Sequence, residues 1–387
     1  MHRREALKLL AGSALALGPT RSIAGYREPR HVVVIGAGIL GAAIGYELSK
    51  RGAKVTILEK TAPAAGATGN SFAYLNASTK SASRPYFDLN WRGLAGWRAW
   101  QQEPGATLPL QWGGSVYWRE ESEGGAKLLS TKKAVEAWGY DAEQIRVEDL
   151  RRLAPTLAIG GFTEGVYYRE EGAVDPAGAV GALLARAKAH GADLIYPSEV
   201  TGFVVSGGRL HGVRTQAGVI EADTVVVAAG IDSQALAQLL QVKVPLEAST
   251  GVLLHTKPQP RLLDRVVFAP GSTFRQSLEG RIISSNAHEG SALTASPAEL
   301  GRQILDSASR YLPQIKNAEI ERITVGRRVV PIDTFPILGF APQVRQLYLT
   351  VTHSGITLAP IVAKAAAIEI LEGTQVQLLE TFRPGRF

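Results

Sequence analysis

A short segment near the N-terminus constrains the fold of this chain most strongly. His31-Val-Val-Val-Ile35 is a near-continuous apolar run, which is typical of a strand buried on both faces. Gly36-Ala37-Gly38-Ile39-Leu40-Gly41 follows at once, and a helical pattern then runs to Gly52, a helix stop signal. Lys54–Leu58 is a second apolar strand, and it ends at Glu59. This succession predicts a strand–turn–helix–strand unit at the start of an α/β fold.

The glycines of this turn each have a physical role in binding a dinucleotide. Gly36 permits the tight turn, Gly38 lets the backbone approach a pyrophosphate, and Gly41 lets the helix pack closely on the strand. The helix N-terminus offers free N–H groups and a positive dipole end to the phosphates. Its first residues, which we also predict to contact the cofactor, are Ile39 and Leu40.

Glu59 narrows the choice of dinucleotide. It follows Gly41 by 18 residues, where a carboxylate can accept hydrogen bonds from ribose hydroxyls. It would repel a 2′-phosphate, which disfavours NADP. The choice between NAD and FAD stays open at this point.

Four further segments carry a resemblance to a known family. They are Gly66–Ser71, Gly172–Pro176 with the predicted helix Ala177–His190, Ala222–Gly230, and Gly326–Thr357 with the helix that follows. Together with the glycine turn they resemble the D-amino-acid-oxidase-like flavoproteins, which include glycine oxidase, monomeric sarcosine oxidase and bacterial D-amino-acid dehydrogenase. The resemblance extends from residue 30 to 373 and implies FAD. A simple NAD dehydrogenase would usually have one contiguous nucleotide domain, whereas these segments are dispersed.

The resemblance also implies where FAD is held. Family members contact the pyrophosphate and flavin with a small, Ser/Gly-rich segment after the second strand. A helix N-terminus beside the flavin would stabilise the negative charge of the reduced ring. The residues implied in these roles are Lys60, Ala67, Thr68, Asn70, Ser71, Val200, Ala229, Gly230, Ser354, Gly355, Ile356 and Thr357. Taken alone, Gly66–Ser71 also fits a flexible loop, and the last four residues fit a plain strand–helix turn.

Two blocks interrupt the nucleotide-binding pattern. Residues 86–163 contain all six tryptophans, most of which we expect in the core. Residues 241–321 alternate between strand patterns and end in a helix near 298–312. We predict that these blocks form an inserted α+β substrate domain, whose mostly antiparallel sheet roofs the flavin. The predicted Rossmann-like FAD-binding domain is discontinuous and consists of residues 27–85, 164–240 and 322–387.

The resemblance implies oxidation of the C–N bond of an amino acid or secondary amine. A hydride passes to flavin N5, and the resulting imine hydrolyses. Such a reaction needs little acid–base help when the amine arrives neutral. The electron acceptor is oxygen or a quinone. An NAD-linked dehydrogenase and a non-catalytic flavin-binding subunit of a larger complex are the alternatives.

Four side chains are candidates for contacting the substrate. Arg328 aligns with a family arginine that binds the substrate carboxylate, and a guanidinium matches a carboxylate with two parallel hydrogen bonds. Arg327 would point the other way along a strand. His353 lies at the predicted flavin-facing turn, and Arg275 and His288 lie in the predicted roof. A structural arginine at 328, a merely paired His353 and surface positions for the other two are the alternatives.

The turn at His353 departs from the family pattern. Glycine oxidase has a longer turn between its histidine and the following glycine, with a second arginine inside it. His353-Ser354-Gly355 is short and lacks that arginine. This argues against a glycine-oxidase-like carboxylate clamp within the turn and is compatible with a bulkier, cyclic or secondary-amine substrate.

Composition excludes several other classes. The chain has no cysteine, which excludes disulfides, thiolate metal sites and a cysteinyl–flavin bond, and we predict no metal site. The formal charge of +7 comes from scattered basic residues. A nucleic-acid-binding surface would concentrate them beside stacking aromatics, so we expect no nucleic-acid partner.

Residues 1–24 resemble a twin-arginine export signal. Arg3-Arg4 precedes an apolar stretch, Leu9–Gly18, and Ser22-Ile23-Ala24 fits a cleavage site. The apolar stretch is shorter than the roughly 20 residues that a membrane span needs. We therefore expect a periplasmic protein, with membrane association only through its electron acceptor or an uncleaved signal. An ordinary amphipathic helix is the alternative.

Overall fold

The computed structural model describes residues 20–22, 30–286 and 295–387. Of the predicted export signal, only Thr20–Ser22 lie within these ranges. They form strand β1, which pairs antiparallel with β22 (Thr374–Val376). His288 lies outside the described residues. Within the described ranges, no helix combines the length and hydrophobicity needed to cross a bilayer.

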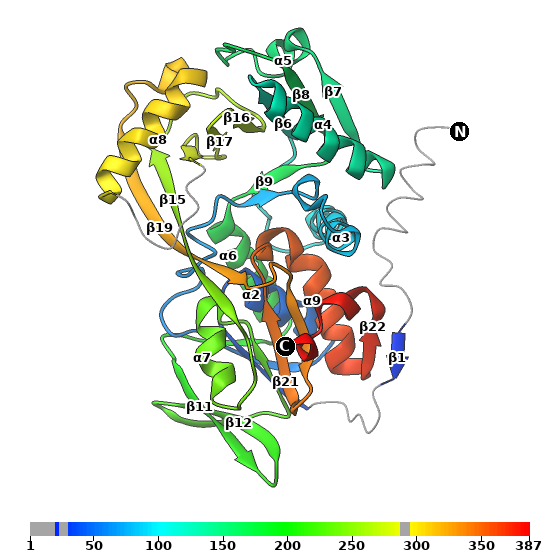
Figure 1. The fold of residues 1–387 in the computed structure, drawn as a ribbon. Coiled ribbons are helices and arrows are strands. Elements are labelled where there is room, and N and C mark those ends of the chain that lie inside the picture. The colour runs from blue at the N-terminus through cyan, green and yellow to red at the C-terminus, as the bar shows by residue number, and fades with distance from the viewer. Residues whose placement is uncertain (1–19, 23–29, 287–294) are drawn as a thin grey trace.

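A six-stranded sheet forms the core of the lower half of the molecule in Figure 1. Its order is β10 (Asp193–Ile195), β3 (Lys54–Leu58), β2 (His31–Ile35), β14 (Thr224–Val227), β21 (Val344–Val351) and β20 (Ile337–Ala341). All neighbours are parallel except β20 and β21. Strands β2 and β3 occupy the predicted residues.

The two faces of this sheet pack against different layers, which explains the unbroken apolar runs. Val32 and Val34 face a helical layer, whereas Val33 and Ile35 face the opposite side. The helical layer comprises α2 (Ile39–Lys50), α3 (Arg84–Gln102), α6 (Pro176–Ala189) and α9 (Gly355–Glu372). The opposite layer comprises β11 (Val200–Ser206), β12 (Arg209–Thr215), β13 (Gly218–Glu221) and α7 (Ser233–Gln238).

An eight-stranded sheet, here called the roof sheet, forms the upper half. Its order is β19 (Ile320–Pro331), β15 (Leu246–Thr256), β18 (Ile282–Ser285), β17 (Ser272–Gln276), β16 (Val266–Ala269), β6 (Ser115–Arg119), β8 (Glu164–Tyr168) and β7 (Ala142–Ile145). Only β16 and β6 pair in parallel. The predicted mostly antiparallel sheet and the α/β fold class are both confirmed.

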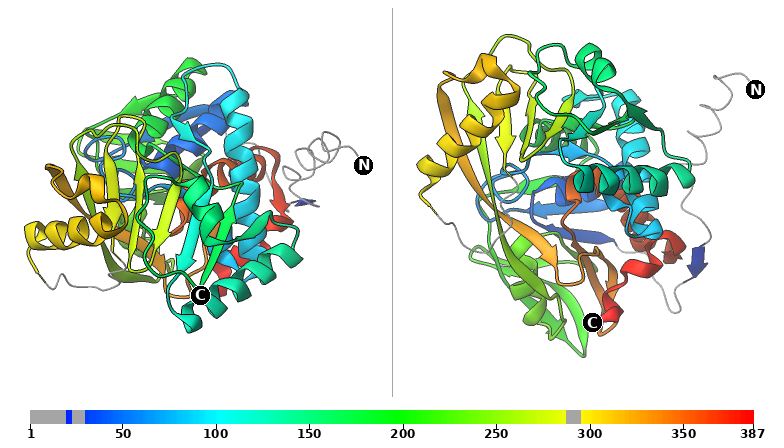
Figure 2. Two further views of the ribbon diagram at one scale, coloured as in Figure 1. Left: turned by 90° about the horizontal axis from the view of Figure 1, so that it is seen from above. Right: turned by 45° about the horizontal axis from the view of Figure 1, so that its top comes forward.

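The outer face of the roof sheet is covered by helix α8 (Pro297–Tyr311), which lies at the periphery in both views of Figure 2. Helix α4 (Ser122–Ala137) packs at the β6–β8–β7 end, and α5 (Val147–Leu153) contributes Leu150 to the hydrophobic cluster that contains Trp118 of β6. A small antiparallel sheet joins the two halves: β4 (Tyr74–Leu75), β9 (Gly172–Val174) and β5 (Leu110–Gln111). The 3₁₀ turns are η1 (Ser78–Lys80), η2 (Gly230–Asp232), η3 (Pro313–Ile315), η4 (Gln377–Phe382) and η5 (Pro384–Arg386).

The boundary between the two halves differs from the predicted domain boundaries in three places. Helix α3, inside predicted substrate block 86–163, packs against α9 instead, and Trp97 Nε1 donates a hydrogen bond to the Ile356 carbonyl at 2.8 Å. Strand β8 belongs to the roof sheet. Strands β15 and β19 run from the roof toward the lower half (Figure 1). The boundary therefore crosses regular elements, where composition gives no signal.

Candidate active site

The glycine turn between β2 and α2 has the geometry that its sequence predicts. Gly36 has φ +103°, a backbone conformation that favours glycine. A Cβ at Gly41 would lie 1.9 Å from the Gly36 carbonyl oxygen. The helix can therefore begin against the turn only because residue 41 has no side chain.

The first turn of α2 has the features of an anion-binding site. Helix N-termini leave N–H groups without intrahelical acceptors, and α2 has no acidic residue in its first turn. Thr68 Oγ1 accepts one of these groups, Ile39 N–H, at 3.1 Å. Glu59 lies beside the turn at the end of β3, where its Oε2 accepts Ala37 N–H at 2.9 Å.

Helix α9 begins beside α2. A Cβ at Gly355 would lie 3.5 Å from the Leu40 side chain and 3.7 Å from Ile39 Cγ2. Helix α9 also has no acidic residue in its first turn, and Thr357 Oγ1 donates to the Tyr74 carbonyl at 3.2 Å. Two positive helix ends thus converge where the resemblance places a pyrophosphate and the negatively charged end of a reduced flavin. The residues present fit FAD.

The segment 66–71 is held by its own hydrogen bonds. Asn70 Nδ2 donates to the Gly66 carbonyl at 2.9 Å, and Ser71 Oγ accepts Ala73 N–H at 2.9 Å. A Cβ at Gly326 would lie 2.9 Å from Asn70 Cβ. This loop lies between the start of α2 and strand β19.

The remaining predicted cofactor residues differ in how close they lie to the glycine turn and in how exposed they are. Ala229 and Gly230 follow β14, and Ala228 lies so close to the glycine turn that a Cβ at Gly36 would be 2.5 Å from its carbonyl oxygen. Val200 is buried at the start of β11 and Ala67 is exposed. Lys60 Nζ forms an ion pair with Asp232 at 2.6 Å, so the positive charge of Lys60 is paired with a carboxylate of the protein.

Arg328 and His353 are close enough for the Arg328 charge to affect the pKa of His353. Arg328 is half-buried on β19, and its Nε donates to Ser249 Oγ at 2.9 Å. Arg327 is exposed on the opposite face. Although His353 reaches solvent, desolvation by the surrounding protein and the positive charges of Lys80 and Arg328 lower its pKa to about 4. His353 is therefore neutral at pH 7.

Arg275 does not lie beside this pair, although the sequence predicts it as a substrate contact. On the roof sheet Arg275 pairs with Ile283, which pairs with His255. Arg328 pairs with Ser249, so two strands lie between the two arginines, and their positions differ by six residues along β15. The sequence placed Arg275 in the roof and Arg328 in the FAD-binding domain, and it did not indicate the sheet register that separates them.

The Arg275 guanidinium is committed to the protein backbone. The residue is 2% exposed, and it donates to the Phe72 carbonyl at 2.7 Å and the Val174 carbonyl at 3.4 Å. Burial lowers its pKa to about 10, so it remains a cation at neutral pH. Arg275 thus helps to position the segment that follows Ser71, while its Nη1 is buried without a hydrogen-bond partner among the described residues.

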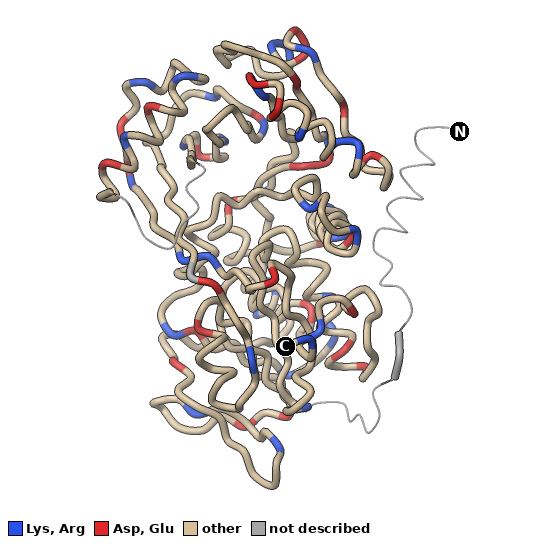
Figure 3. Tube along the Cα trace, in the orientation of Figure 1, with Lys and Arg blue, Asp and Glu red and all other residues tan. Residues whose placement is uncertain are grey.

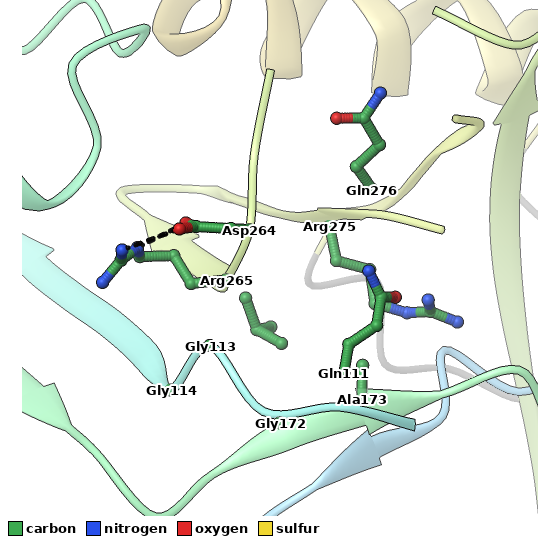
Figure 4. Close-up of a pocket in the computed structure, with 10 residues that line it drawn as sticks. Gln111, Gly113, Gly114, Gly172, Ala173, Asp264, Arg265, Arg275 and Gln276 are labelled. Atoms are coloured by element: carbon green, nitrogen blue, oxygen red, sulfur yellow. Dashed lines mark hydrogen bonds and ion pairs between the residues drawn. The ribbon is translucent and has the colours of Figure 1, made fainter. Parts of the chain in front are cut away.

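A small pocket adjoins Arg275 but is separate from the candidate site. It lies between the 111–114 turn, strand β9 and the roof sheet (Figure 4). Asp264 and Arg265 form an ion pair at 2.9 Å on one side of it, and the Arg275 side chain is directed away from that pair. Neither the glycine turn nor the start of α9 lines this pocket.

Comparison with known proteins assigns the family. Residues 31–368 match the model of the DAO family, described as FAD dependent oxidoreductase. The chain belongs to this family. FAD is therefore its cofactor, as predicted, and the NAD alternative is wrong.

Individual relatives in the family are distant in sequence. The bifunctional protein ThiO/ThiG of Trichormus variabilis is 28% identical over 372 residues, which cover 92% of this chain and 55% of that protein. The chain thus spans about half the length of the first curated relatives it matches. Glycine oxidase of Geobacillus kaustophilus is 26% identical, with 85% of this chain and 90% of that protein covered. The crystal structure of L-proline dehydrogenase from P. horikoshii has the same fold, with a TM-score of 0.84, 24% identity and coverage of 94% and 98%.

Charge over this DAO-family chain is mixed. Figure 3 shows Lys and Arg interspersed with Asp and Glu over both halves of the described structure. The excess of positive charge is therefore spread over many elements. Each cation at the candidate site affects mainly the groups next to it.

A buried carboxyl group near the site was not predicted. Glu171 is fully buried and accepts hydrogen bonds from Ala77 N–H at 3.2 Å and Ser78 N–H at 3.0 Å. Hydroxyl donors to it are Ser115, Tyr74 and Tyr140. Burial raises the pKa of Glu171 well above its ordinary value, against the two backbone N–H groups, which lower it. In the sequence, the pair Glu170-Glu171 resembles an exposed loop. Glu171 is buried only because segments distant in the chain pack around it, and local sequence gives no sign of this.

Replacing Glu171 by alanine should destabilise the fold, because two backbone N–H groups and three hydroxyls lose their common acceptor. We expect the free energy of unfolding to fall by about 2–5 kcal/mol, measured by urea denaturation. Glu143→Ala is the control, because Glu143 forms only an exposed pair with Arg169, worth about 1 kcal/mol or less. Equal effects of the two substitutions would contradict the role given to Glu171.

Proposed function

We propose that this protein uses FAD to oxidise the C–N bond of an amino acid or of a secondary amine that carries a carboxylate. The observation that carries the proposal is the position of Arg328. This cation is half-buried beside the turn that starts α9 and has no acidic partner within the described residues. A guanidinium in that position can bind a carboxylate with two hydrogen bonds.

The arrangement supports orientation of the substrate rather than acid catalysis. Bound FAD would supply a two-electron acceptor at N5. Arg328 would hold the carboxylate and so fix the Cα–H bond relative to that acceptor. His353 is neutral at pH 7, because its pKa is about 4, and can accept or donate a hydrogen bond without adding charge.

The inner face of the roof sheet supplies an apolar wall over this region. The Tyr117 and Phe268 rings stack with centroids 4.1 Å apart and planes 2° apart. Tyr74 packs against Phe268 at 5.0 Å. Tyr74 follows the 66–71 loop and lies on β4, beneath these rings. Rings in this position would exclude water from the reacting carbon.

The proposed reaction has three parts. The substrate would lose a hydride from carbon and a proton from nitrogen, which leaves a C=N bond, and bound FAD would supply the two-electron acceptor. Water would then add to the imine and release a carbonyl compound and an amine or ammonia. Oxygen or a quinone would take up the two electrons and the accompanying protons in the third part.

Product identification tests the proposal. The FAD-loaded protein is incubated with glycine, sarcosine, proline and both enantiomers of common amino acids, in air and separately with a quinone. We expect a carbonyl product from at least one of them. Hydrogen peroxide formed in air identifies an oxidase, and product only with the quinone identifies a dehydrogenase. No product from any of these amines in either condition would contradict the proposed function.

A further inference from the structure

Helix α9 contains a proline at a position where the backbone hydrogen bond of the helix is lost. Leu358 N–H donates to the Ser354 carbonyl at 3.0 Å, which is the first bond of the regular helical pattern. Two residues later the pattern requires a donor at Pro360 for the Ile356 carbonyl, but proline has no N–H group. The carbonyl of the buried Ile356 therefore needs a donor from elsewhere in the protein.

Trp97 of α3 supplies this donor. Its indole Nε1 donates to the Ile356 carbonyl at 2.8 Å, and the Trp97 side chain is fully buried. An indole N–H can only donate, and leaving it or the carbonyl unpaired inside the protein would be costly. The bond between Trp97 and Ile356 thus replaces, from a neighbouring helix, the bond that Pro360 cannot make.

Two glycines of α3 allow the helices to approach closely enough for this bond. A Cβ at Gly93 would lie 2.3 Å from the Thr357 carbonyl oxygen, and a Cβ at Gly96 would lie 2.5 Å from Pro360 Cβ. These glycines and Trp97 lie on one face of α3, because residues three and four apart are neighbours on a helix. That face holds both the first turn of α9 and its proline.

The turn held in this way, residues 354–357, is the part of α9 next to the glycine turn of the FAD site. A Cβ at Gly355 would lie 3.5 Å from the Leu40 side chain at the start of α2. Ser354 N–H donates to Thr352 Oγ1 at 3.3 Å, whereas the N–H groups of residues 355–357 have no acceptor within the helix. Together with the positive end of the helix dipole, these groups would stabilise the negative charge of reduced FAD.

We propose that Trp97 is a positioning residue of the FAD site. By binding the Ile356 carbonyl it fixes the direction of the N–H groups at the start of α9, and so raises the reduction potential of bound FAD. Trp97 acts through α9 and needs no contact with the cofactor or the substrate. The inference goes beyond the proposed function, because it concerns the cofactor and applies whichever amine is oxidised.

The reduction potential of Trp97→Phe tests this role. The substitution removes the N–H donor and keeps a large buried aromatic ring. The potential of bound FAD is measured anaerobically against a reference dye, together with FAD content and thermal unfolding. The ratio of the affinities for reduced and oxidised FAD should fall about tenfold, which lowers the potential by about 30 mV for a two-electron couple. The measurement needs no amine, so its result is independent of the proposed function.

Pro360→Ala provides the rescue, because alanine restores the N–H group that the Ile356 carbonyl lacks. Alone it should keep the wild-type potential, since a carbonyl oxygen can accept two hydrogen bonds. In the double variant with Trp97→Phe, the potential should return to that of Pro360→Ala. A double variant with a potential as low as that of Trp97→Phe would show that the hydrogen bond is not the cause, and the inference would be wrong.

Trp100→Phe is the matched control on the same helix. Trp100 is also buried, and its Nε1 donates to Glu47 Oε1 of α2 at 2.9 Å rather than to α9. Its ring packs edge-to-face on Trp97 at 5.5 Å, so the substitution loosens the packing around Trp97 without removing its bond. We expect lower stability and an unchanged potential. If Trp100→Phe lowers the potential as much as Trp97→Phe, loosened packing explains the shift and the inference is wrong.

The double variant also covers the case in which Trp97→Phe alone does not retain FAD. Alanine at position 360 supplies the missing donor, so the double variant should bind FAD with the potential of Pro360→Ala. A lower potential, or failure to retain FAD, would show that Trp97 contributes something other than this hydrogen bond and would overturn the inference.

Discussion

Replacing Gly41 by alanine should abolish FAD binding. The added Cβ would lie 1.9 Å from the Gly36 carbonyl oxygen and 3.0 Å from its carbonyl carbon. Both are backbone atoms, so only a shift of α2 away from the turn could relieve the overlap. That shift would move the N–H groups of the first helical turn away from the pyrophosphate. We expect at least about a 100-fold loss in FAD affinity, equivalent to about 2.7 kcal/mol.

Gly181→Ala provides the matched control in another helix of the same layer. A Cβ at Gly181 in α6 meets no atom within 4 Å, and alanine there should stabilise the helix by about 0.5–1 kcal/mol. The measurement is the amount of FAD retained per protein, together with titration of the apoprotein with FAD. Equal FAD affinity in the two variants would show that the turn does not hold the cofactor as described.

Replacing Arg328 by methionine should produce the largest loss of activity among changes that leave FAD in place. The substitution keeps a long apolar side chain but removes the guanidinium that would bind the carboxylate. We expect kcat/KM for a carboxylate-bearing amine to fall about 100-fold or more, because charge-assisted hydrogen bonds contribute about 1.5–3 kcal/mol each. Arg328 also donates to Ser249 Oγ, so FAD content and thermal stability must be measured alongside.

The neighbouring residue makes the control unusually close. Arg327 lies on the same strand with its side chain exposed on the other face, and Arg327→Met removes the same charge at nearly the same place in the chain. It should change kcat/KM by less than about threefold. Similar losses in both variants would indicate an effect of net charge or stability, and would remove the carboxylate-binding role from Arg328.

The parts of the fold and site that sequence predicts are those that depend on local patterns. The turn Gly36–Gly41 and the strand ending at Glu59 are read from consecutive residues, because the glycines and the apolar runs have direct steric meanings. Arg328 and His353 come from separate elements, and each was proposed as a candidate only because of the family resemblance.

The parts that sequence does not predict depend on register and tertiary packing. Arg275 lies in the predicted roof, on β17, two strands away from β15. In that position its guanidinium donates hydrogen bonds to backbone carbonyls. Glu171 lies in a polar stretch that resembles a solvent-exposed loop. Its buried position arises only because β4 and β9 bring that stretch between the two halves of the molecule.

The most direct test of the central claim is anaerobic mixing of the FAD-loaded protein with paired ligands, followed through the visible absorbance of the flavin. Each pair contains a carboxylate-bearing amine and the same amine without its carboxylate, such as sarcosine with dimethylamine and proline with pyrrolidine. We expect at least one carboxylate-bearing amine to bleach the flavin, and its partner to do so far more slowly or not at all. Failure of all these amines to reduce a fully loaded flavin, or equal reduction by both members of every reactive pair, would contradict it.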